Sequence, residues 1–279
     1  MSVFSSYQGD IRSGLPAWTW MWGTAFAIFG LLKGITWWQQ RWAAPAWKQI
    51  AYLFAWPGMD ATAFLEFPQS GVRHPDLGEW TVAIFNFCLG LGLIAFSAPL
   101  QTIAGPYAGG CAGFAGIVFV LHFGLFHIAS CGWRSAGILA APIMNWPIAS
   151  QSVSEFWSRR WNMAFRDLTH RFLFRPLTRR MGATNAMMIG FLASGIVHDV
   201  VISGPAGGGW GLPTCYFIVQ SVGVLLERTR WGNQVGLDNG FIGRIWSFAV
   251  IGLPCPLLFH RPFVCNVIVP FLNFIGATS

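Results

Sequence analysis

Charged residues are scarce in this sequence. Asp, Glu, Lys and Arg make up only 10% of its 279 residues, whereas hydrophobic residues make up 54%, and the mean hydropathy is +0.52. A soluble domain usually carries about 25% charged residues, and a chain of this composition would have nowhere to place its apolar surface in water. The composition therefore excludes an ordinary soluble domain and indicates an integral, multi-pass membrane protein.

Several other signals are also missing. The six cysteines include no Cys-x-x-Cys pair and no metal-ligand spacing, so we expect no metal site and interpret them as small core residues. The first residues lack the basic start and the small-residue cleavage site of a secretory signal peptide, so the first apolar run is expected to remain as a spanning helix. The net charge is +7, but no stretch carries a nucleic-acid-binding motif, so we expect no nucleic acid partner.

Apolar runs define the expected fold, because about 20 apolar residues cross roughly 30 Å of hydrocarbon as a helix. The clearest runs are 17–36, 80–98, 107–128 and 184–203, and shorter or proline-broken runs are 135–149, 212–226, 245–260 and 263–276. We therefore predict an all-α, polytopic transmembrane bundle with about eight membrane elements. No repeat, low-complexity tract or linker divides it, so 1–279 is expected to be a single domain.

Positive charge orients these elements, because short loops rich in Lys and Arg stay in the cytoplasm. Seven arginines lie within 158–180, so this stretch is expected on the cytoplasmic side, and 204–211 on the other. Arg134 also indicates the cytoplasm, and run 135–149 is therefore expected to re-enter rather than to cross. The sixteen tryptophans, many near the ends of runs, are typical of interfacial belts.

The stretch that follows has the pattern of a helix that does not span. Ser152 followed by Glu155 is a capping box. Apolar residues then recur at three- and four-residue spacing, at Trp157, Trp161, Phe165, Leu168 and Phe172. The pattern predicts an amphipathic helix at the cytoplasmic interface. Trp157 and Trp161 would either line the mouth of a tunnel or anchor this helix.

His198 is the most informative single residue. It lies about fifteen residues into run 184–203, roughly 21 Å deep in the hydrocarbon, and Asp199 follows it. Ionisable groups at such a depth usually line a functional cavity or pair internally, and a histidine satisfied by a neighbouring helix is the alternative. A neutral imidazole in a dry site can take a proton from a hydroxyl group as that hydroxyl attacks a thioester. His122 and His127 lie nearer the end of their run and are weaker candidates.

Three stretches together resemble the wax synthase branch of the membrane-bound O-acyltransferases. They are 144–152 (MNWPIASQS), 155–162 (EFWSRRWN) and 191–198 (FLASGIVH), and 56–60 (WPGMD) is similar to an earlier element of that branch. The resemblance implies an acyl-CoA donor as co-substrate, an alcohol acceptor, and an embedded histidine reached by an internal tunnel. No other cofactor is implied.

By position, the resemblance makes His198 the catalytic base and Asn162 a second catalytic residue that orients the substrate or polarises the thioester. Periodicity alone places Asn162 on a polar helix face as a solvated residue, and the resemblance overrides that interpretation. Substrate binding is assigned to Trp157, Arg160, Trp161, Arg166, Ser194 and Asp199. Within this set, the arginines face the phosphates of coenzyme A or simply mark a cytoplasmic loop, and Asp199 tunes the imidazole in a position where relatives often carry Glu.

The expected reaction is transfer of a fatty acyl group to a long-chain alcohol, which yields a wax ester. A sterol, a diacylglycerol or a small hydroxylated metabolite remains an alternative acceptor. A transporter or a non-enzymatic membrane scaffold is the alternative of another class, although many transporters are built from internal repeats and none is visible here. The expected partners are acyl-CoA, the acceptor and membrane lipids.

Overall fold

The computed structural model describes residues 14–41, 44–66 and 71–277, and every regular element in these ranges is a helix or a helical turn. The α-helices are α1 (Ala17–Trp38), α2 (Ala46–Ala55), α3 (Ala61–Leu65), α4 (Leu77–Ala104), α5 (Pro106–Val118), α6 (Phe126–Ser135), α7 (Val153–Glu155), α8 (Met163–Thr169), α9 (Arg175–His198), α10 (Gly204–Ala206), α11 (Leu212–Glu227), α12 (Arg230–Val235), α13 (Gly240–Gly252), α14 (Cys255–Leu258), α15 (Arg261–Phe263) and α16 (Val269–Phe274). Wider π-helical turns are η2 (Phe119–Leu125), η4 (Phe156–Arg160), η5 (His170–Phe174), η6 (Asp199–Ser203) and η7 (Val264–Ile268), and η3 (Pro147–Ala149) is a 3₁₀ turn. The all-α prediction is confirmed for this part of the chain.

Four helical stretches among the described residues are long and apolar enough to cross a membrane. They are Leu77–Ala104, Pro106–Ser135, Met163–Ala206 and Gly240–Leu258, and Leu212–Glu227 and Arg261–Phe274 are shorter apolar helices. The helix expected over 17–36 is present as α1 but is not among these four. The count of about eight membrane elements therefore stays a prediction.

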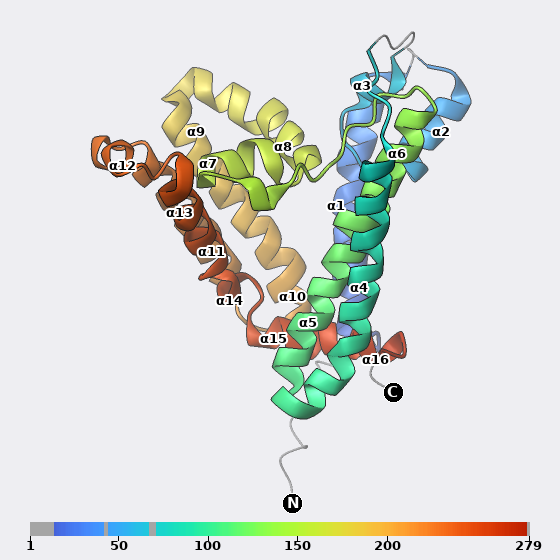
Figure 1. Ribbon diagram of the computed structural model, residues 1–279, viewed down its shortest axis with the longest axis vertical. Helices are drawn as coiled ribbons and strands as arrows, with labels where there is room; N and C mark the ends of the chain where they lie inside the picture. Colours follow the sequence, from blue (N-terminus) through green and yellow to red (C-terminus); the bar gives the residue numbers. More distant parts are fainter. Residues whose placement is uncertain (1–13, 42–43, 67–70, 278–279) are drawn as a thin grey trace, which may run out of the picture.

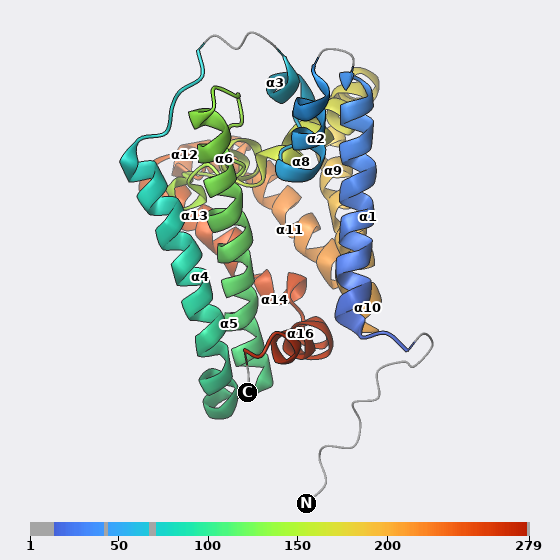
Figure 2. The ribbon, with the colours of Figure 1, turned by 90° about the vertical axis from the view of Figure 1, so that its right-hand side faces the viewer.

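The elements lie in two groups that converge at the end marked by α15 and α16 (Figure 1), and at the other end α8 shares a core cluster with α2 and α3. Helices α4, α5 and α6 pack together, whereas α1 stands apart from them in Figure 2 and contacts α2 and α10. Helices α7 to α13 form the other group, and α15 and α16 lie across the lower end in Figure 1. Figure 2 shows α4 and α5 side by side along their length. Glycines allow this close approach, since a Cβ atom on Gly116 would lie 2.7 Å from the carbonyl oxygen of Gly90 on the facing helix.

Most of the apolar run 135–149 is not helical, and its expected re-entry into the membrane stays a prediction. Helix α6 ends at Ser135, Gly137 has a positive φ of 77°, and the chain stays non-helical as far as η3. Ile138 and Ile143 from this stretch are 4% and 5% exposed and pack in a core cluster with Tyr52. The run is thus buried only in part, because Leu139, Trp146 and Ile148 are exposed.

The single amphipathic helix expected after Ser152 is interrupted. The structure has α7 and η4, then a break at Trp161 and Asn162, then α8, η5 and α9. Helix α9 itself changes direction at Gly182, whose φ of 82° and ψ of 163° are not helical. Figure 1 shows the result, with the first part of α9 lying across the end of the molecule and the second part descending toward α10.

Candidate active site

The first two segments of the sequence pattern lie directly against each other. The backbone N–H of Asn145 donates to the carbonyl oxygen of Arg160 at 2.8 Å, and the N–H of Met163 donates to that of Ile143 at 2.9 Å. The side-chain amide of Asn145 also donates to the carbonyl oxygen of Arg159 at 3.1 Å. Stretch 143–146 therefore holds the turn that carries Asn162.

Asn162 ends one helical segment and starts the next. Its φ of 43° and ψ of 65° are left-handed, and its Oδ1 accepts the backbone N–H of Phe165 at 3.2 Å as the N-cap of α8. Asparagine is one of the few residues other than glycine that adopt this conformation readily. Asn162 is thus neither solvated on a continuous helix face nor joined by a hydrogen bond to His198 among the described residues. A direct role in the chemistry stays a prediction.

Replacement of Asn162 separates these two roles. Asn162→Ala removes the cap and places a Cβ-bearing residue without a polar side chain in the left-handed region, so we expect it to lower the free energy of unfolding by about 1–2 kcal/mol. Asn162→Asp keeps the cap and should retain stability. Thermal unfolding in detergent, beside an acyl-transfer assay, measures both effects. An Asp variant that is stable but inactive would assign chemistry to the amide, and one with full activity would restrict Asn162 to shaping the turn.

His198 is the last residue of α9, and its protonation pattern follows from one contact. Its Nδ1 lies 2.7 Å from the carbonyl oxygen of Ser194. A carbonyl oxygen only accepts, so Nδ1 carries the proton and Nε2 carries the lone pair. The wide turn η6 begins at the next residue, and such turns are frequent at functional sites. Ser194 therefore acts on His198 through its backbone.

Aromatic rings form a wall beside the imidazole. The ring of Phe217 on α11 lies 4.6 Å from that of His198, centroid to centroid. Trp157 packs against Phe217 at 5.6 Å and against Phe191 at 5.8 Å. Trp161 stacks on Phe156 at 5.4 Å instead. Trp157 thus packs inside the protein, in the core cluster that includes the His198 wall.

Asp199 points its carboxylate at the start of the next helix. It is 6% exposed. Its Oδ1 accepts from Ser203 Oγ at 3.0 Å and from the N–H of Gly211 at 2.8 Å, and its Oδ2 accepts from the N–H and the hydroxyl of Thr214. The carboxylate thereby ties the end of α9 to α11, and this geometry favours an anchor over the expected contact with substrate.

We expect Asp199→Asn to lower the free energy of unfolding by about 1–3 kcal/mol, because an amide group replaces one acceptor and faces N–H donors that are then unpaired. The shift in the thermal unfolding midpoint in detergent measures this. Serine at position 203 is bonded to the same carboxylate, so Ser203→Ala is the matched control, with a smaller expected loss. An unchanged midpoint in Asp199→Asn would contradict the anchoring role.

The two arginines assigned to phosphate binding already have partners. Arg160 Nη2 lies 2.6 Å from Glu155 Oε1, and Arg160 Nη1 donates to the carbonyl oxygen of Trp146 at 3.3 Å. Burial raises the pKa of Glu155, but hydrogen bonds from the N–H of Gln151 and from Arg160 outweigh it, and the pKa is lowered overall. Arg166 pairs with Asp167 at 3.1 Å. Phosphate binding by either arginine stays a prediction.

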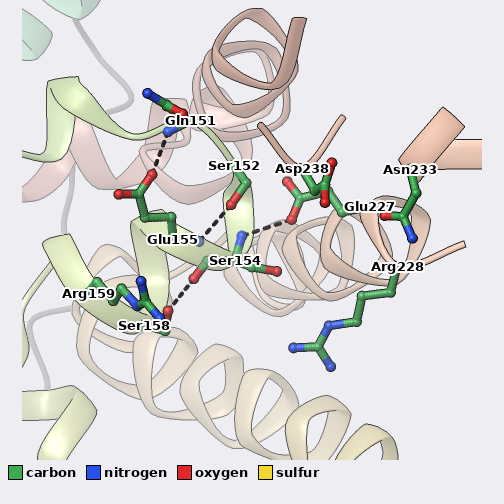
Figure 3. Close-up of a pocket in the computed structure, with 10 residues that line it drawn as sticks. All are labelled: Gln151, Ser152, Ser154, Glu155, Ser158, Arg159, Glu227, Arg228, Asn233 and Asp238. Carbon is green, nitrogen blue, oxygen red and sulfur yellow. Dashed lines mark hydrogen bonds between the residues drawn. The ribbon is translucent and has the colours of Figure 1, made fainter. Parts of the chain in front are cut away.

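A polar cavity of about 610 Å³ lies beside η4 and the end of α11 (Figure 3). Its lining residues are Gln151, Ser152, Ser154, Glu155, Ser158, Arg159, Glu227, Arg228, Asn233 and Asp238. Glu227 accepts backbone N–H groups from Val153 and Ser154, whereas Arg159 and Arg228 are exposed and stand on opposite sides of the cavity. His198 and Asn162 do not line it, so the tunnel between cytoplasm and histidine also stays a prediction.

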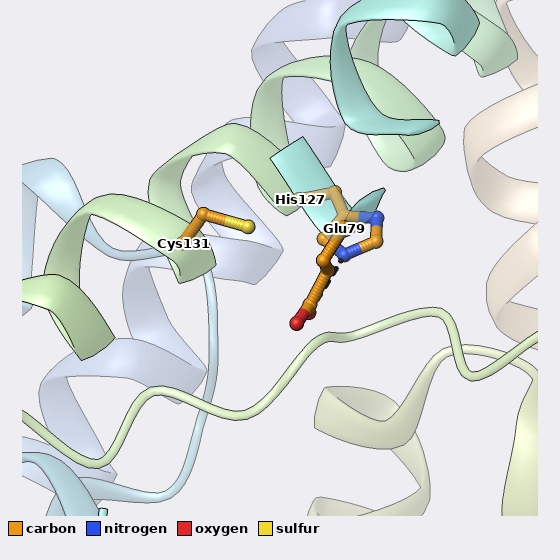
Figure 4. A group of neighbouring side chains, drawn as sticks. All are labelled: Glu79, His127 and Cys131. Carbon is orange, nitrogen blue, oxygen red and sulfur yellow. Dashed lines mark hydrogen bonds and ion pairs between the residues drawn. The ribbon is translucent and has the colours of Figure 1, made fainter. Parts of the chain in front are cut away.

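A second cluster of titratable groups joins α4 to α6 (Figure 4). Ligand atoms of Glu79, His127 and Cys131 lie within 4.8 Å of one another. However, Glu79 is paired with the guanidinium of Arg134 and with His127 Nε2, the latter at 3.1 Å. Arg134 Nη2 also contacts Cys131 Sγ at 3.6 Å. Because a cation already occupies these ligand atoms, we assign the cluster to structure.

Sequence comparisons bear on the same region. Residues 140–219 match the model of the family described as Membrane bound O-acyl transferase family. A probable long-chain-alcohol O-fatty-acyltransferase 2 of Arabidopsis thaliana is 29% identical over 184 residues, which is 57% of this chain and 50% of the relative. A long-chain-alcohol O-fatty-acyltransferase of Simmondsia chinensis is 31% identical over 72 residues, 23% of this chain and 20% of the relative.

The chain thus spans at most about half the length of these curated relatives. No solved structure matches it. The matched segment 140–219 contains Asn162 and its turn, His198, and the rings of Trp157, Phe191 and Phe217. Residues 140–219 thus resemble the membrane-bound O-acyltransferase family, and the relatives that the chain matches are named as long-chain-alcohol O-fatty-acyltransferases.

Proposed function

We propose that this protein transfers a fatty acyl group from acyl-CoA to the hydroxyl group of a long-chain alcohol, with His198 as the general base. The observation that carries the proposal is the contact between His198 Nδ1 and the carbonyl oxygen of Ser194. It leaves Nε2 as the basic atom of an imidazole at the end of an apolar helix. The names of the plant relatives support a long-chain alcohol as acceptor.

The chemistry needs no covalent acyl-enzyme. Nε2 of His198 takes the hydroxyl proton while the alcohol oxygen attacks the thioester carbonyl carbon. The tetrahedral intermediate then collapses, the carbon–sulfur bond breaks, and the proton on Nε2 passes to the leaving thiolate. The products are one ester and free coenzyme A, and a water-poor site suppresses the competing hydrolysis.

The polar cavity is the site we propose for the coenzyme A end of the donor. Arg159 and Arg228 have no acidic partner among the described residues, so their guanidinium groups are available for charge-assisted hydrogen bonds to phosphate. They also lie on the side of the chain that the basic loops assign to the cytoplasm. Acyl-CoA would then enter from the side on which it is made.

The test is release of coenzyme A by the purified protein in detergent, given palmitoyl-CoA with and without hexadecanol. Release that requires the alcohol, together with hexadecyl palmitate detected by mass spectrometry, is the expected result. Ester formed only with a sterol, a diacylglycerol or a small alcohol would keep the reaction and change the acceptor. No ester with any acceptor or acyl length would favour a transporter or scaffold.

A further inference from the structure

Pro254 interrupts the helical hydrogen bonds just after α13, near the aromatic rings that lie beside His198. In a continuous helix the carbonyl oxygen of Val250 would accept the N–H of residue 254, but residue 254 is a proline and has none. Helix α13 accordingly ends at Gly252, and α14 starts at Cys255. Unpaired carbonyl groups are costly in an apolar environment, so this oxygen needs another donor.

Two side chains of α11 supply donors at this break. Gln220 Nε2 donates to the carbonyl oxygen of Val250 at 2.8 Å, and one turn earlier the Tyr216 hydroxyl donates to that of Ile251 at 3.3 Å. Both side chains are buried, with 0% and 3% of their surface exposed. The carbonyl oxygen of Ile251 has a second donor, because Cys255 Sγ lies 3.3 Å from it, whereas Gln220 is the side chain that donates to Val250.

The ring of Tyr216 packs on Phe217 at 5.3 Å, a contact that Tyr216→Phe retains, whereas Gln220 makes a second hydrogen bond. Its Oε1 accepts the indole N–H of Trp157 at 3.2 Å. The amide orientation is unambiguous, because the carbonyl of Val250 only accepts and an indole N–H only donates. One buried amide therefore connects the proline break in α13 with Trp157.

Trp157 carries this connection to the histidine. Its ring packs at 5.6 Å against Phe217, which also contacts the imidazole of His198 at 4.6 Å. Phe191, on the same helix as His198, also contacts the indole, at 5.8 Å. Without its hydrogen bond, the indole would be free to turn in its pocket and to release Phe217.

We propose that Gln220 is a positioning residue of the acyl-transfer reaction, acting through Trp157 and Phe217 on the orientation of the His198 imidazole. The inference rests on the proposed function for its kinetic part. The assignment concerns a residue that does not touch the reacting atoms, so its loss should lower kcat and leave the KM for the alcohol nearly unchanged.

The experiment compares Gln220→Met with Tyr216→Phe. Each variant preserves the approximate shape of the side chain and removes one hydrogen bond to a carbonyl at the break, but only the first also frees Trp157. We expect kcat to fall about 10–100-fold in Gln220→Met, since small displacements of catalytic groups have effects of this size, and to stay within about twofold in Tyr216→Phe. Similar kcat values in the two variants would reduce Gln220 to a structural donor and overturn the proposal.

A third variant tests the hydrogen bond between Gln220 and Trp157 without disturbing the one between Gln220 and Val250. Trp157→Phe removes the indole N–H and leaves the bond from Gln220 to Val250 intact. Its kcat should also fall, and the double variant with Gln220→Met should lose little more than either single one, because residues that act as a unit are not additive. Fully additive losses would contradict action through Trp157.

A measurement that does not depend on catalytic activity distinguishes failure of this inference from failure of the proposed function. The rate at which diethyl pyrocarbonate modifies His198, followed by peptide mass spectrometry, reports the imidazole environment. We expect the rate to change in Gln220→Met and not in Tyr216→Phe. A changed rate in a protein whose wild type makes no ester would remove the proposed function and keep the positioning role. Equal rates in all three proteins would remove the positioning role.

Discussion

His198→Ala should lower the rate of ester formation by about 10²–10⁴-fold, the usual contribution of a general base. In His198, Nδ1 donates its hydrogen bond to the carbonyl oxygen of Ser194, and Nε2 therefore remains free to accept a proton. The measurement is hexadecyl palmitate formed per enzyme and minute, by mass spectrometry. The His198→Ala variant should still bind acyl-CoA in the polar cavity, because His198 does not line that cavity.

His198→Gln is the matched control for this variant. A glutamine amide can still donate a hydrogen bond to a backbone carbonyl and fills much of the same space, but it cannot accept a proton at neutral pH. We therefore expect a loss as large as that of His198→Ala in a protein that elutes as a single folded species. Full activity in His198→Gln would show that a hydrogen bond, and not a base, is what the reaction requires.

Arg134→Met should lower the free energy of unfolding by about 3–5 kcal/mol, the usual cost of removing one partner of a buried ion pair. Arg134 is 5% exposed and its guanidinium pairs with Glu79, donating from Nη1 to Oε2 at 3.2 Å, while its Nε donates to Ser130 Oγ at 3.2 Å. Its removal leaves the carboxylate of Glu79 with only His127. The measurement is the thermal unfolding midpoint in a mild detergent.

The double variant Glu79→Leu with Arg134→Met tests whether the unpaired carboxylate of Glu79 causes this loss of stability. Replacing both charges by apolar side chains removes the uncompensated carboxylate, so we expect it to recover a large part of the lost stability. A double variant less stable than Arg134→Met alone would mean that the hydrogen bonds to Ser130 and the surrounding packing outweigh the ion pair. A stable Arg134→Met would contradict the buried-pair account altogether.

The sequence predicted some elements well because the signal was local. Runs 80–98, 107–128 and 184–203 lie within helices of the structure, since a long apolar run leaves a chain in lipid no other way to satisfy its backbone. The run 135–149 is also apolar, yet residues 136–146 are not helical. Hydropathy reports that a segment avoids water and does not distinguish lipid from protein as the surroundings.

In the candidate site, too, the sequence identified some residues, whereas other features became visible only in the structure. Depth in an apolar run and the family pattern identify His198, and the pattern identifies Asn162. Neither signal reveals that Asn162 breaks the helix in which periodicity placed it. Gln220 was missed, although a polar residue in an apolar run, with Pro254 downstream, was a usable signal. Its partners lie 63 and 30 residues away in sequence.

By itself, the sequence determined that this chain is a helical membrane protein with an embedded histidine and the pattern of an O-acyltransferase. These properties depend on composition and on residues close in sequence, and they do not require knowledge of which helices pack together. Only the tertiary structure decided that Asp199 anchors α11, that Arg160 is held by Glu155, and that Trp157 stands beside Phe217. Hydrogen bonds and ring contacts depend on which helices meet, and packing decides that after the helices have formed.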